Sequence, residues 1–200
     1  MQNQSAPAQV RAASRAVQLT SSVIGQEYCR NTATQEAKLN LKLKLSVRNI
    51  GDATLLVCRY CNSIHRVVLS NSLKKAEAGD YAYDQHSTVG HLPFPKITDT
   101  QLLSPEAGLF VTLKPGESFD YEYPQPIDIT LTDAGNRSLR VSPGRYLLQV
   151  KIETWDWDME RRKMLEQRLA QSGSLFYRDV ASEPLAISIE KPESTIAPCK

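Results

Sequence analysis

A strict alternation of apolar and polar residues, beginning at Lys38, constrains the fold of this chain more than any other feature. Its apolar members are Leu39, Leu41, Leu43, Leu45 and Val47, and the polar residues between them are Asn40, Lys42, Lys44, Ser46 and Arg48. A period of two places the apolar side chains on one face of a β-strand, whereas helical spacing would scatter them around the axis. Residues 38–49 are therefore predicted to form a strand with one buried face, which needs a second apolar layer to cover it.

The rest of the chain supplies further short strands. Alternating or continuous apolar stretches cover residues 17–29, 53–60, 63–70, 109–113, 118–123, 127–131, 145–153 and 182–189. Asn49-Ile50-Gly51-Asp52 is predicted to turn the chain after the alternating strand. Lys114-Pro115-Gly116-Glu117 has the proline and the glycine of a type II turn. Many short strands separated by turns are typical of an all-β antiparallel sandwich.

One helix interrupts this pattern, and it is predicted over residues 156–171. Asp156 lies in its first turn, where an acidic side chain complements the helix dipole, and Leu165 belongs to its apolar stripe. Gly173 stands just beyond the predicted end, where a glycine commonly terminates a helix. Residues 155–177 are thus expected to be a helical insertion before the last strands.

Segments without periodicity divide the chain. Residues 1–15 are a polar, flexible leader without the apolar core of a signal peptide, residues 16–190 a single domain, and residues 191–200 a polar tail. Within the domain, residues 71–108 follow no period and are expected to form a long loop that packs onto the body through its aromatic side chains.

Four segments carry a resemblance to uncharacterised bacterial immunoglobulin-like proteins. They lie within residues 38–190 and cover residues 45–52, 113–119, 144–146 and 182–189. The corner from Pro143 to Leu148 also resembles the start of strand F in such domains, where a tyrosine precedes the second core cysteine by two residues. Leu148 takes the place of that cysteine here, so the inter-sheet disulfide of antibody domains is absent. The resemblance implies an immunoglobulin-like strand topology and export.

A more distant resemblance is to the BsuPI-type proteinase inhibitors, which are also small sandwiches. It transfers no reactive residue to this chain. It suggests one alternative function, a proteinase inhibitor that presents the exposed segment Leu92-Pro93-Phe94-Pro95 to a protease.

The charges of the chain are balanced, with a formal net charge of +2 from 24 basic and 22 acidic residues. Because the two signs are mixed along the sequence, no nucleic-acid partner is predicted. No apolar run approaches the roughly 20 residues that span a bilayer, so no transmembrane segment is predicted. The 4 cysteines permit two disulfides. Together with the resemblance, they favour a secreted or periplasmic chain that has lost its signal peptide, with a cytoplasmic protein as the alternative.

Cys58-Arg59-Tyr60-Cys61, followed by His65, is the most distinctive chemical motif. A turn at its centre would bring the two sulfurs together to bind a metal ion with His65, or to act as a redox pair. On a continuous strand, residues three apart point to opposite faces, which favours structural cysteines instead. The candidate disulfide cysteines are Cys29, Cys58, Cys61 and Cys199. A bridge from a terminal cysteine to the central pair would pin a chain end to the sheet.

Aromatic residues are the candidate binding groups. Trp155 and Trp157 either form a platform for a sugar ring or anchor the predicted helix on the sandwich. Tyr81, Tyr83 and Phe94 are the candidates in the long loop, because function on such scaffolds is concentrated in loops.

The sequence contains no nucleophile elbow, phosphate-binding glycine loop or His-Glu-x-x-His motif. It therefore predicts a non-enzymatic binding or structural module without a cofactor. This module is expected to contact a protein or glycan partner through residues 71–108 or residues 155–177. A metal-binding or redox protein that uses Cys58, Cys61 and His65 is the second alternative, beside the proteinase inhibitor.

Overall fold

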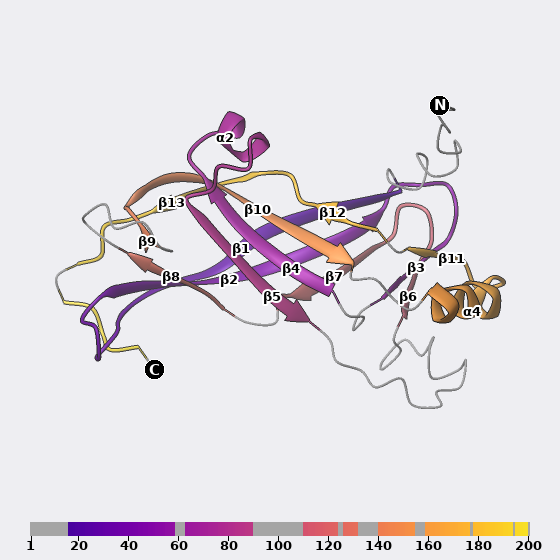
Figure 1. The fold of residues 1–200 in the computed structure, drawn as a ribbon, viewed down its shortest axis with the longest axis horizontal. Helices are drawn as coiled ribbons and strands as arrows, with labels where there is room; N and C mark the ends of the chain where they lie inside the picture. The colour runs from indigo at the N-terminus through magenta and orange to yellow at the C-terminus, as the bar shows by residue number, and fades with distance from the viewer. Residues whose placement is uncertain are drawn as a thin grey trace, which may run out of the picture.

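The computed structural model describes residues 16–58, 63–89, 110–123, 126–131, 140–154, 159–176, 178–193 and 195–199. These residues form a β-sandwich of two five-stranded sheets and a smaller three-stranded sheet, with mostly antiparallel pairing (Figure 1). The predicted all-β sandwich is therefore confirmed. None of the helices in these ranges is long and apolar enough to cross a membrane.

The first sheet is built around the alternating strand. Its strands are β1 (Val17–Arg30), β2 (Ala37–Asn49), β7 (Ser118–Glu122), β8 (Ile127–Leu131) and β9 (Arg140–Val141). β2 pairs with β1 along its whole length on one side, and with β8 and then β7 on the other side. The strand predicted over residues 38–49 is thus the central strand of this sheet, and pairing on both sides fixes its register.

The second sheet lies across the first and is built around β10 (Figure 1). Its strands are β4 (Ser63–Ser70), β5 (Tyr83–Val89), β10 (Gly144–Thr154), β12 (Val180–Ala181) and β13 (Leu185–Ile189). β10 pairs with β4 on one side and with β13 and β12 on the other, and β5 lies beyond β4. Between β12 and β13 the buried hydroxyl of Ser182 accepts a hydrogen bond from the Val150 amide at 3.0 Å, which satisfies a backbone donor of β10.

The small sheet and the longer helix form one end of the molecule (Figure 1). β3 (Leu55–Cys58) lies between β6 (Phe110–Leu113) and β11 (Ser174–Phe176), and its pairing with β11 is parallel. α4 (Met159–Leu169) buries Leu165 and Leu169 beside β11. The predicted helical insertion before the last strands is confirmed.

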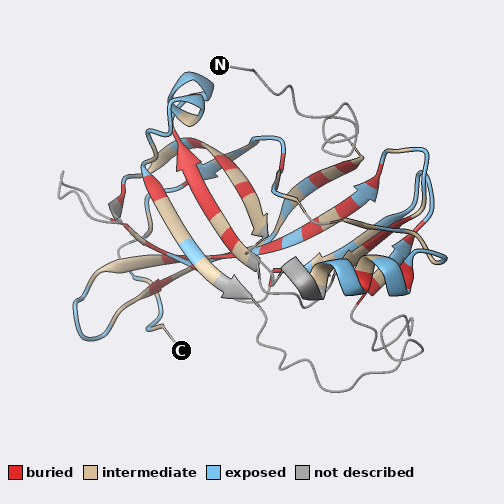
Figure 2. Ribbon diagram, turned by 45° about the vertical axis from the view of Figure 1, so that its right-hand side comes forward, coloured by how far each residue is buried: buried red, intermediate tan, exposed pale blue. Residues whose placement is uncertain are grey.

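The facing sheets bury the rows of side chains that the alternation predicts (Figure 2). The five apolar members of the alternation in β2 are at most 4% exposed. From the second sheet, Tyr146, Leu148 and Val150 of β10 are buried in the same core. Leu148 is fully buried, so an apolar side chain fills the position at which an antibody domain has a cysteine.

Asn49 continues the inward row of β2 and joins two turns inside the core. Its side-chain nitrogen donates hydrogen bonds to the carbonyls of Ala53 at 2.8 Å and Leu113 at 2.9 Å, and its side-chain oxygen accepts one from the Gly51 amide at 2.9 Å. All polar atoms of this fully buried side chain are therefore paired, as burial requires. The neighbouring Lys114–Glu117 turn is of type II, as predicted, with Gly116 at a φ of 84°.

The segment predicted as a long loop contains regular structure that the sequence analysis missed. Residues 71–89 form a short helix, α2 (Leu73–Glu77), and the edge strand β5. The inward positions of β5 include the polar Gln85 and Ser87, so the strand has no apolar alternation to reveal it. Residues 90–108 of the predicted loop lie outside the described residues, as does the predicted leader.

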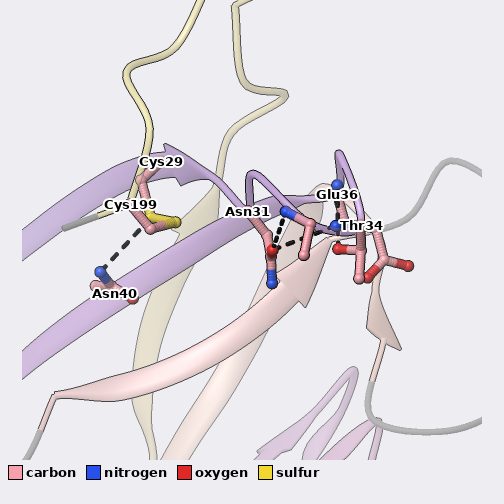
Figure 3. Close-up of a disulfide and its surroundings, with 7 residues drawn as sticks. Cys29, Asn31, Thr34, Glu36, Asn40 and Cys199 are labelled. Atoms are coloured by element: carbon pink, nitrogen blue, oxygen red, sulfur yellow. Dashed lines mark hydrogen bonds between the residues drawn. A yellow bond between two sulfur atoms is a disulfide. The ribbon is translucent and has the colours of Figure 1, made fainter.

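The end of the molecule opposite α4 holds the β1–β2 hairpin and the C-terminal segment (Figure 1). A disulfide joins Cys29, on β1, to Cys199, 170 residues further along the chain (Figure 3). Beside it the Arg30 amide donates to the Ala197 carbonyl at 2.8 Å, and the Cys199 amide donates to the Arg30 carbonyl at 2.9 Å. The C-terminal segment is thus attached to the outer edge of β1 both covalently and by strand-like hydrogen bonds.

The hairpin between β1 and β2 is closed by an asparagine turn. The side-chain oxygen of Asn31 accepts hydrogen bonds from the amides of Ala33 at 2.9 Å and Thr34 at 3.3 Å (Figure 3). Such a turn gives the polar backbone of an exposed tip local partners, so the hairpin end is well defined.

Candidate functional site

The outer face of the second sheet gathers an aromatic ring and several charged side chains, which we call the Tyr81 patch. Its members are Arg66, Tyr81, Asp84, His86, Lys151 and Glu153. They come from β4, from β5 and the residues just before it, and from β10, so three neighbouring strands form the floor of the patch.

The strand register accounts for this gathering. Arg66 of β4 is paired with Lys151 of β10 on one side and with His86 of β5 on the other, which makes a polar row across the sheet. Their sequence neighbours Val67 and Val150 are at most 1% exposed. Because side chains alternate along a strand, burying these valines turns the charged residues toward the solvent.

A short connection returns the chain from β4 to the sheet and positions Tyr81. It contains α2 and then Gly79, whose φ of 72° is favourable only for a residue without a Cβ. The chain rejoins the sheet where the Ala82 amide donates to the Leu69 carbonyl at 2.8 Å. Tyr81 is therefore held next to a fixed backbone contact and not at the tip of a free loop.

Arg66 is the centre of the polar contacts in the patch. Its Nε and Nη2 donate to the two carboxylate oxygens of Asp84 at 2.8 and 2.6 Å, and its Cζ lies 5.1 Å from the centroid of the Tyr81 ring. The hydrogen bond from Arg66 lowers the pKa of Asp84 below its ordinary value, and the same bond raises the pKa of Arg66. Both groups are consequently ionised at neutral pH, and the fork geometry orients the guanidinium.

Lys151 and His86 complete the contacts. Lys151 Nζ donates to the Tyr81 hydroxyl at 2.7 Å, and because it lies beyond that hydroxyl, its 5.1 Å separation from the ring centroid is an edge contact. His86 Nε2 lies 3.2 Å from Asp84 Oδ1, and more than half of its side chain is exposed. The ring of Tyr81 therefore contacts two cations, Arg66 near the ring itself and Lys151 at its hydroxyl edge.

The arrangement offers noncovalent contacts to a partner. The patch contains no serine, threonine or cysteine nucleophile next to a base, which acyl or group transfer would require. It does contain rigidly held hydrogen-bonding groups of both signs around a partly exposed aromatic ring. Such groups on strands need little ordering when a partner binds.

A second polar cluster lies inside the sandwich around His65. The His65 ring is 4% exposed and lies 5.5 Å from the Tyr123 ring and 6.4 Å from the Tyr121 ring. Its Nδ1 has no hydrogen-bond partner among the described residues. Burial lowers the pKa of His65 to about 4, so the ring is neutral at physiological pH.

Three of the four cysteines predicted to be structural are disulfide-bonded. Cys29 and Cys199 pair with each other, so neither terminal cysteine reaches the central pair. Cys58 ends β3 and is itself disulfide-bonded, and Cys61 lies outside the described residues. An oxidised cysteine is not a thiolate ligand, and His65 faces the core tyrosines. The described part of the predicted metal set therefore does not form a metal site.

The predicted aromatic binding residues are dispersed. Tyr81 lies in the patch on the outer sheet face. Tyr83 is only 3% exposed, and its hydroxyl donates to Gln85 and to the Asp128 carbonyl, so its ring is a core group and not a contact surface. Phe94, Trp155 and Trp157 lie outside the described residues, as does the segment Leu92–Pro95.

Sequence reasoning missed five members of the patch, those other than Tyr81. Two of their strands, β4 and β10, were predicted, and the alternation of β10 places Lys151 on the face opposite its apolar row. The consecutive apolar residues 67–69 of β4 leave the face of Arg66 undecided. What the sequence does not contain is the pairing of β4 with both β10 and β5, which lie far apart along the chain.

Comparison of the chain with protein-family models, with curated proteins and with solved structures finds no match. A functional proposal for the chain therefore has its basis in the geometry and chemistry described above.

Proposed function

We propose that this chain is a non-enzymatic, immunoglobulin-like binding module that works outside the cytoplasm and contacts a protein or glycan partner. The observation that carries the proposal is the Tyr81 patch on the outer face of the second sheet. The first half of the predicted long loop contributes Tyr81, Asp84 and His86 to it. The helical insertion at the end of the molecule is the second surface available for a partner.

The strand order supports the immunoglobulin-like assignment. β1, β2 and, on the other side of β2, the successive strands β7 and β8 lie in one sheet, and β13, β10, β4 and β5 lie side by side in the other. In immunoglobulin nomenclature these correspond to strands A, B and E and to strands G, F, C and C′. The Tyr146 hydroxyl donates to the Ser142 carbonyl at 2.7 Å, the hydrogen bond of a tyrosine corner at the start of strand F.

The disulfides support a location outside the cytoplasm. Cys29, Cys58 and Cys199 are all oxidised, and structural disulfides persist in secreted and periplasmic proteins but are rare in the reducing cytosol. A bridge between the first strand and the C-terminal segment also stabilises the fold, as native disulfides of small secreted domains do.

The test is a binding comparison of the full chain with two variants. One variant carries Tyr81→Ala, and in the other a short Gly-Ser linker replaces residues 159–176. Each protein is immobilised and exposed to an exported-protein fraction and to a panel of purified polysaccharides. We expect the wild-type chain to retain a partner and at least one variant to lose it, both variants having kept the β-sheet signal in circular dichroism. A wild-type chain that retains no protein and no polysaccharide would overturn the proposal.

A further inference from the structure

The Tyr81 patch carries charges of both signs that cancel. Arg66 and Lys151 are its cations and Asp84 and Glu153 its carboxylates, so the formal charges sum to zero when His86 is neutral. A polyanion approaching this face meets two carboxylates, and a polycation meets two cations. Like charges brought together at an interface are unfavourable, so the patch fits an uncharged partner.

The hydrogen-bonding groups of the patch retain capacity toward the solvent. Arg66 commits Nε and Nη2 to Asp84, and its Nη1 lies 3.9 Å from Glu153, which is too long for a hydrogen bond. The Glu153 side chain is 38% exposed, and Lys151 Nζ has N–H groups beyond the one that it donates to Tyr81. Among the described residues, the patch thus combines donors and acceptors that keep unused hydrogen-bonding capacity.

A partner for such a surface needs groups that both donate and accept. The hydroxyl groups of a sugar do so, and neighbouring hydroxyls on one ring present a donor and an acceptor side by side. A peptide backbone also offers both, but in an extended partner it is best matched by a strand edge, whereas the patch lies on a sheet face. The chemistry of the patch thus favours a polyol.

The ring of Tyr81 supplies the apolar part of the contact. It is partly exposed, Arg66 lies against it, and Lys151 fixes its hydroxyl at 2.7 Å. The C–H face of a pyranose is apolar and has the width of one aromatic ring, so the two surfaces can stack while the hydroxyls reach the charged groups at the rim. Because its neighbours already orient the ring, little conformational entropy is lost on binding.

We propose that the Tyr81 patch binds a neutral glycan, with a pyranose ring stacked on Tyr81 and its hydroxyls bonded to Arg66, Glu153 and Lys151. This inference rests on the proposed binding function and narrows it to one surface and one class of partner.

The experiment uses the full chain and a glycan array of neutral glucans, mannans, xylans, galactans and chitooligosaccharides, with sulfated and uronic acid glycans beside them. The affinity for the strongest neutral glycan is then measured by calorimetry for the wild type and for Tyr81→Ala, Tyr81→Phe and Glu153→Gln. We expect Tyr81→Ala to weaken binding by about tenfold or more and Tyr81→Phe, which keeps the ring, by only about threefold. Glu153→Gln should weaken it measurably, because a charged acceptor is replaced by an amide.

Lys44→Ala is the matched control for a general effect of surface substitution. Lys44 lies in the first sheet, where it pairs with Asp120 at 2.7 Å, and it has no part in the patch. We expect this variant to bind the glycan with unchanged affinity. Thermal unfolding of each variant identifies any loss that comes from misfolding, and Glu153→Gln tests the patch if Tyr81→Ala does not fold.

The outcomes separate this inference from the proposed function. Retention of a protein from the exported fraction without retention of any neutral glycan would overturn the glycan assignment and leave the binding module standing. Unchanged glycan affinity in both Tyr81→Ala and Glu153→Gln, or binding restricted to sulfated and uronic acid glycans, would also overturn it. A chain that retains neither proteins nor glycans would overturn both.

Discussion

At the scale of single residues, His65 is the most unusual group in the core. A neutral imidazole on β4 is buried beside the rings of Tyr121, in β7, and Tyr123, just after β7, and its Nδ1 is unpaired among the described residues. The groups that face it are Tyr121, Tyr123, Ser87 and Ile152. Burial raises the pKa values of both tyrosines, so these are neutral as well, and no carboxylate among these facing groups would offset a positive charge on the ring.

His65 should therefore make the stability of the fold depend on pH. The pKa of His65 is about 4 in the folded chain, whereas the ordinary value of 6.5 applies to the unfolded chain. As the pH falls, the unfolded chain therefore takes up the proton first. The stability present above pH 6.5 is then lost progressively, by about 2.5 kcal/mol at about pH 4.5. Urea unfolding at pH 7 and pH 4.5 measures this loss.

His65→Phe should remove this pH dependence, because a similar ring without a titrating nitrogen then fills the site. Asp84 does not interfere, since its lowered pKa places its own loss at a more acidic pH. His86→Phe is the control, as that side chain is more than half exposed. An equal acid loss in His65→Phe and in the wild type would contradict the assignment.

A second prediction at the residue scale concerns the contribution of Asn49 to stability. Its side-chain nitrogen donates to the carbonyls of Ala53 and Leu113 in a fully buried site. Asn49→Ala should lower the free energy of unfolding by about 2–4 kcal/mol, because two buried carbonyls lose their donors. Asn49→Asp should destabilise more at neutral pH, since a carboxylate would face the same two carbonyls. Chemical unfolding of the three proteins at pH 7 measures the order, and Asn49→Asp as stable as the wild type would contradict it.

At the scale of elements, the sequence predicts those whose side-chain pattern matches their environment. β2 and β8 alternate because one face is buried, and the type II turn is specified by its own Pro115 and Gly116. The sequence does not predict β5 or α2, for two different reasons. The inward residues of β5 are partly polar, and α2 is a 5-residue helix without buried residues.

The candidate site is less predictable than the strands that carry it. Tyr81 was a candidate because it is an aromatic residue in an irregular segment. Arg66, Lys151 and His86 form one row only because β4 pairs with both β10 and β5. Pairing between distant segments depends on the packing of the whole core, and a local pattern does not encode it. The burial of Tyr83 has the same origin, since it faces inward opposite Leu69.

The prediction for the helical insertion concerns the effect of a substitution at Gly173 on stability. It follows α4 with a φ of 151°, and a Cβ at this position would lie 2.9 Å from the Thr54 carbonyl oxygen. Gly173→Ala should therefore displace β11 from β3 and lower the free energy of unfolding by about 2–3 kcal/mol. Gly116→Ala is the matched control, because its φ is also positive but nothing lies within 4 Å of the added Cβ. Equal losses in the two variants, measured by urea unfolding, would show that the contact with Thr54 is unimportant.

At the scale of the whole molecule, the C-terminal segment is joined to the last residues of the first strand at one end of the sandwich. β1 begins the first sheet, the last strands belong to the second sheet, and the C-terminal segment returns to the edge of β1. The disulfide at Cys29 (Figure 3) and the hydrogen bonds at Arg30 attach it there. The segment therefore covers part of a sheet edge that would otherwise be open for pairing with another chain.

The bridge from Cys29 to Cys199 should accordingly stabilise the whole molecule. Replacing both cysteines by serine reopens a loop of 170 residues and should lower the free energy of unfolding by about 2–5 kcal/mol. Amide exchange near residues 195–199 should rise toward that of an unfolded chain, while the buried amides of β10 and of the later part of β2 stay protected. β2 lies beside the bridge at its start, where Lys38 pairs with Cys29 and Asn40 Nδ2 lies 3.8 Å from the Cys29 sulfur. Hydrogen exchange with mass spectrometry reports both regions in one experiment. Continued protection of residues 195–199 in the variant would mean that the two hydrogen bonds at Arg30 suffice to hold the segment and that the disulfide is dispensable for the edge.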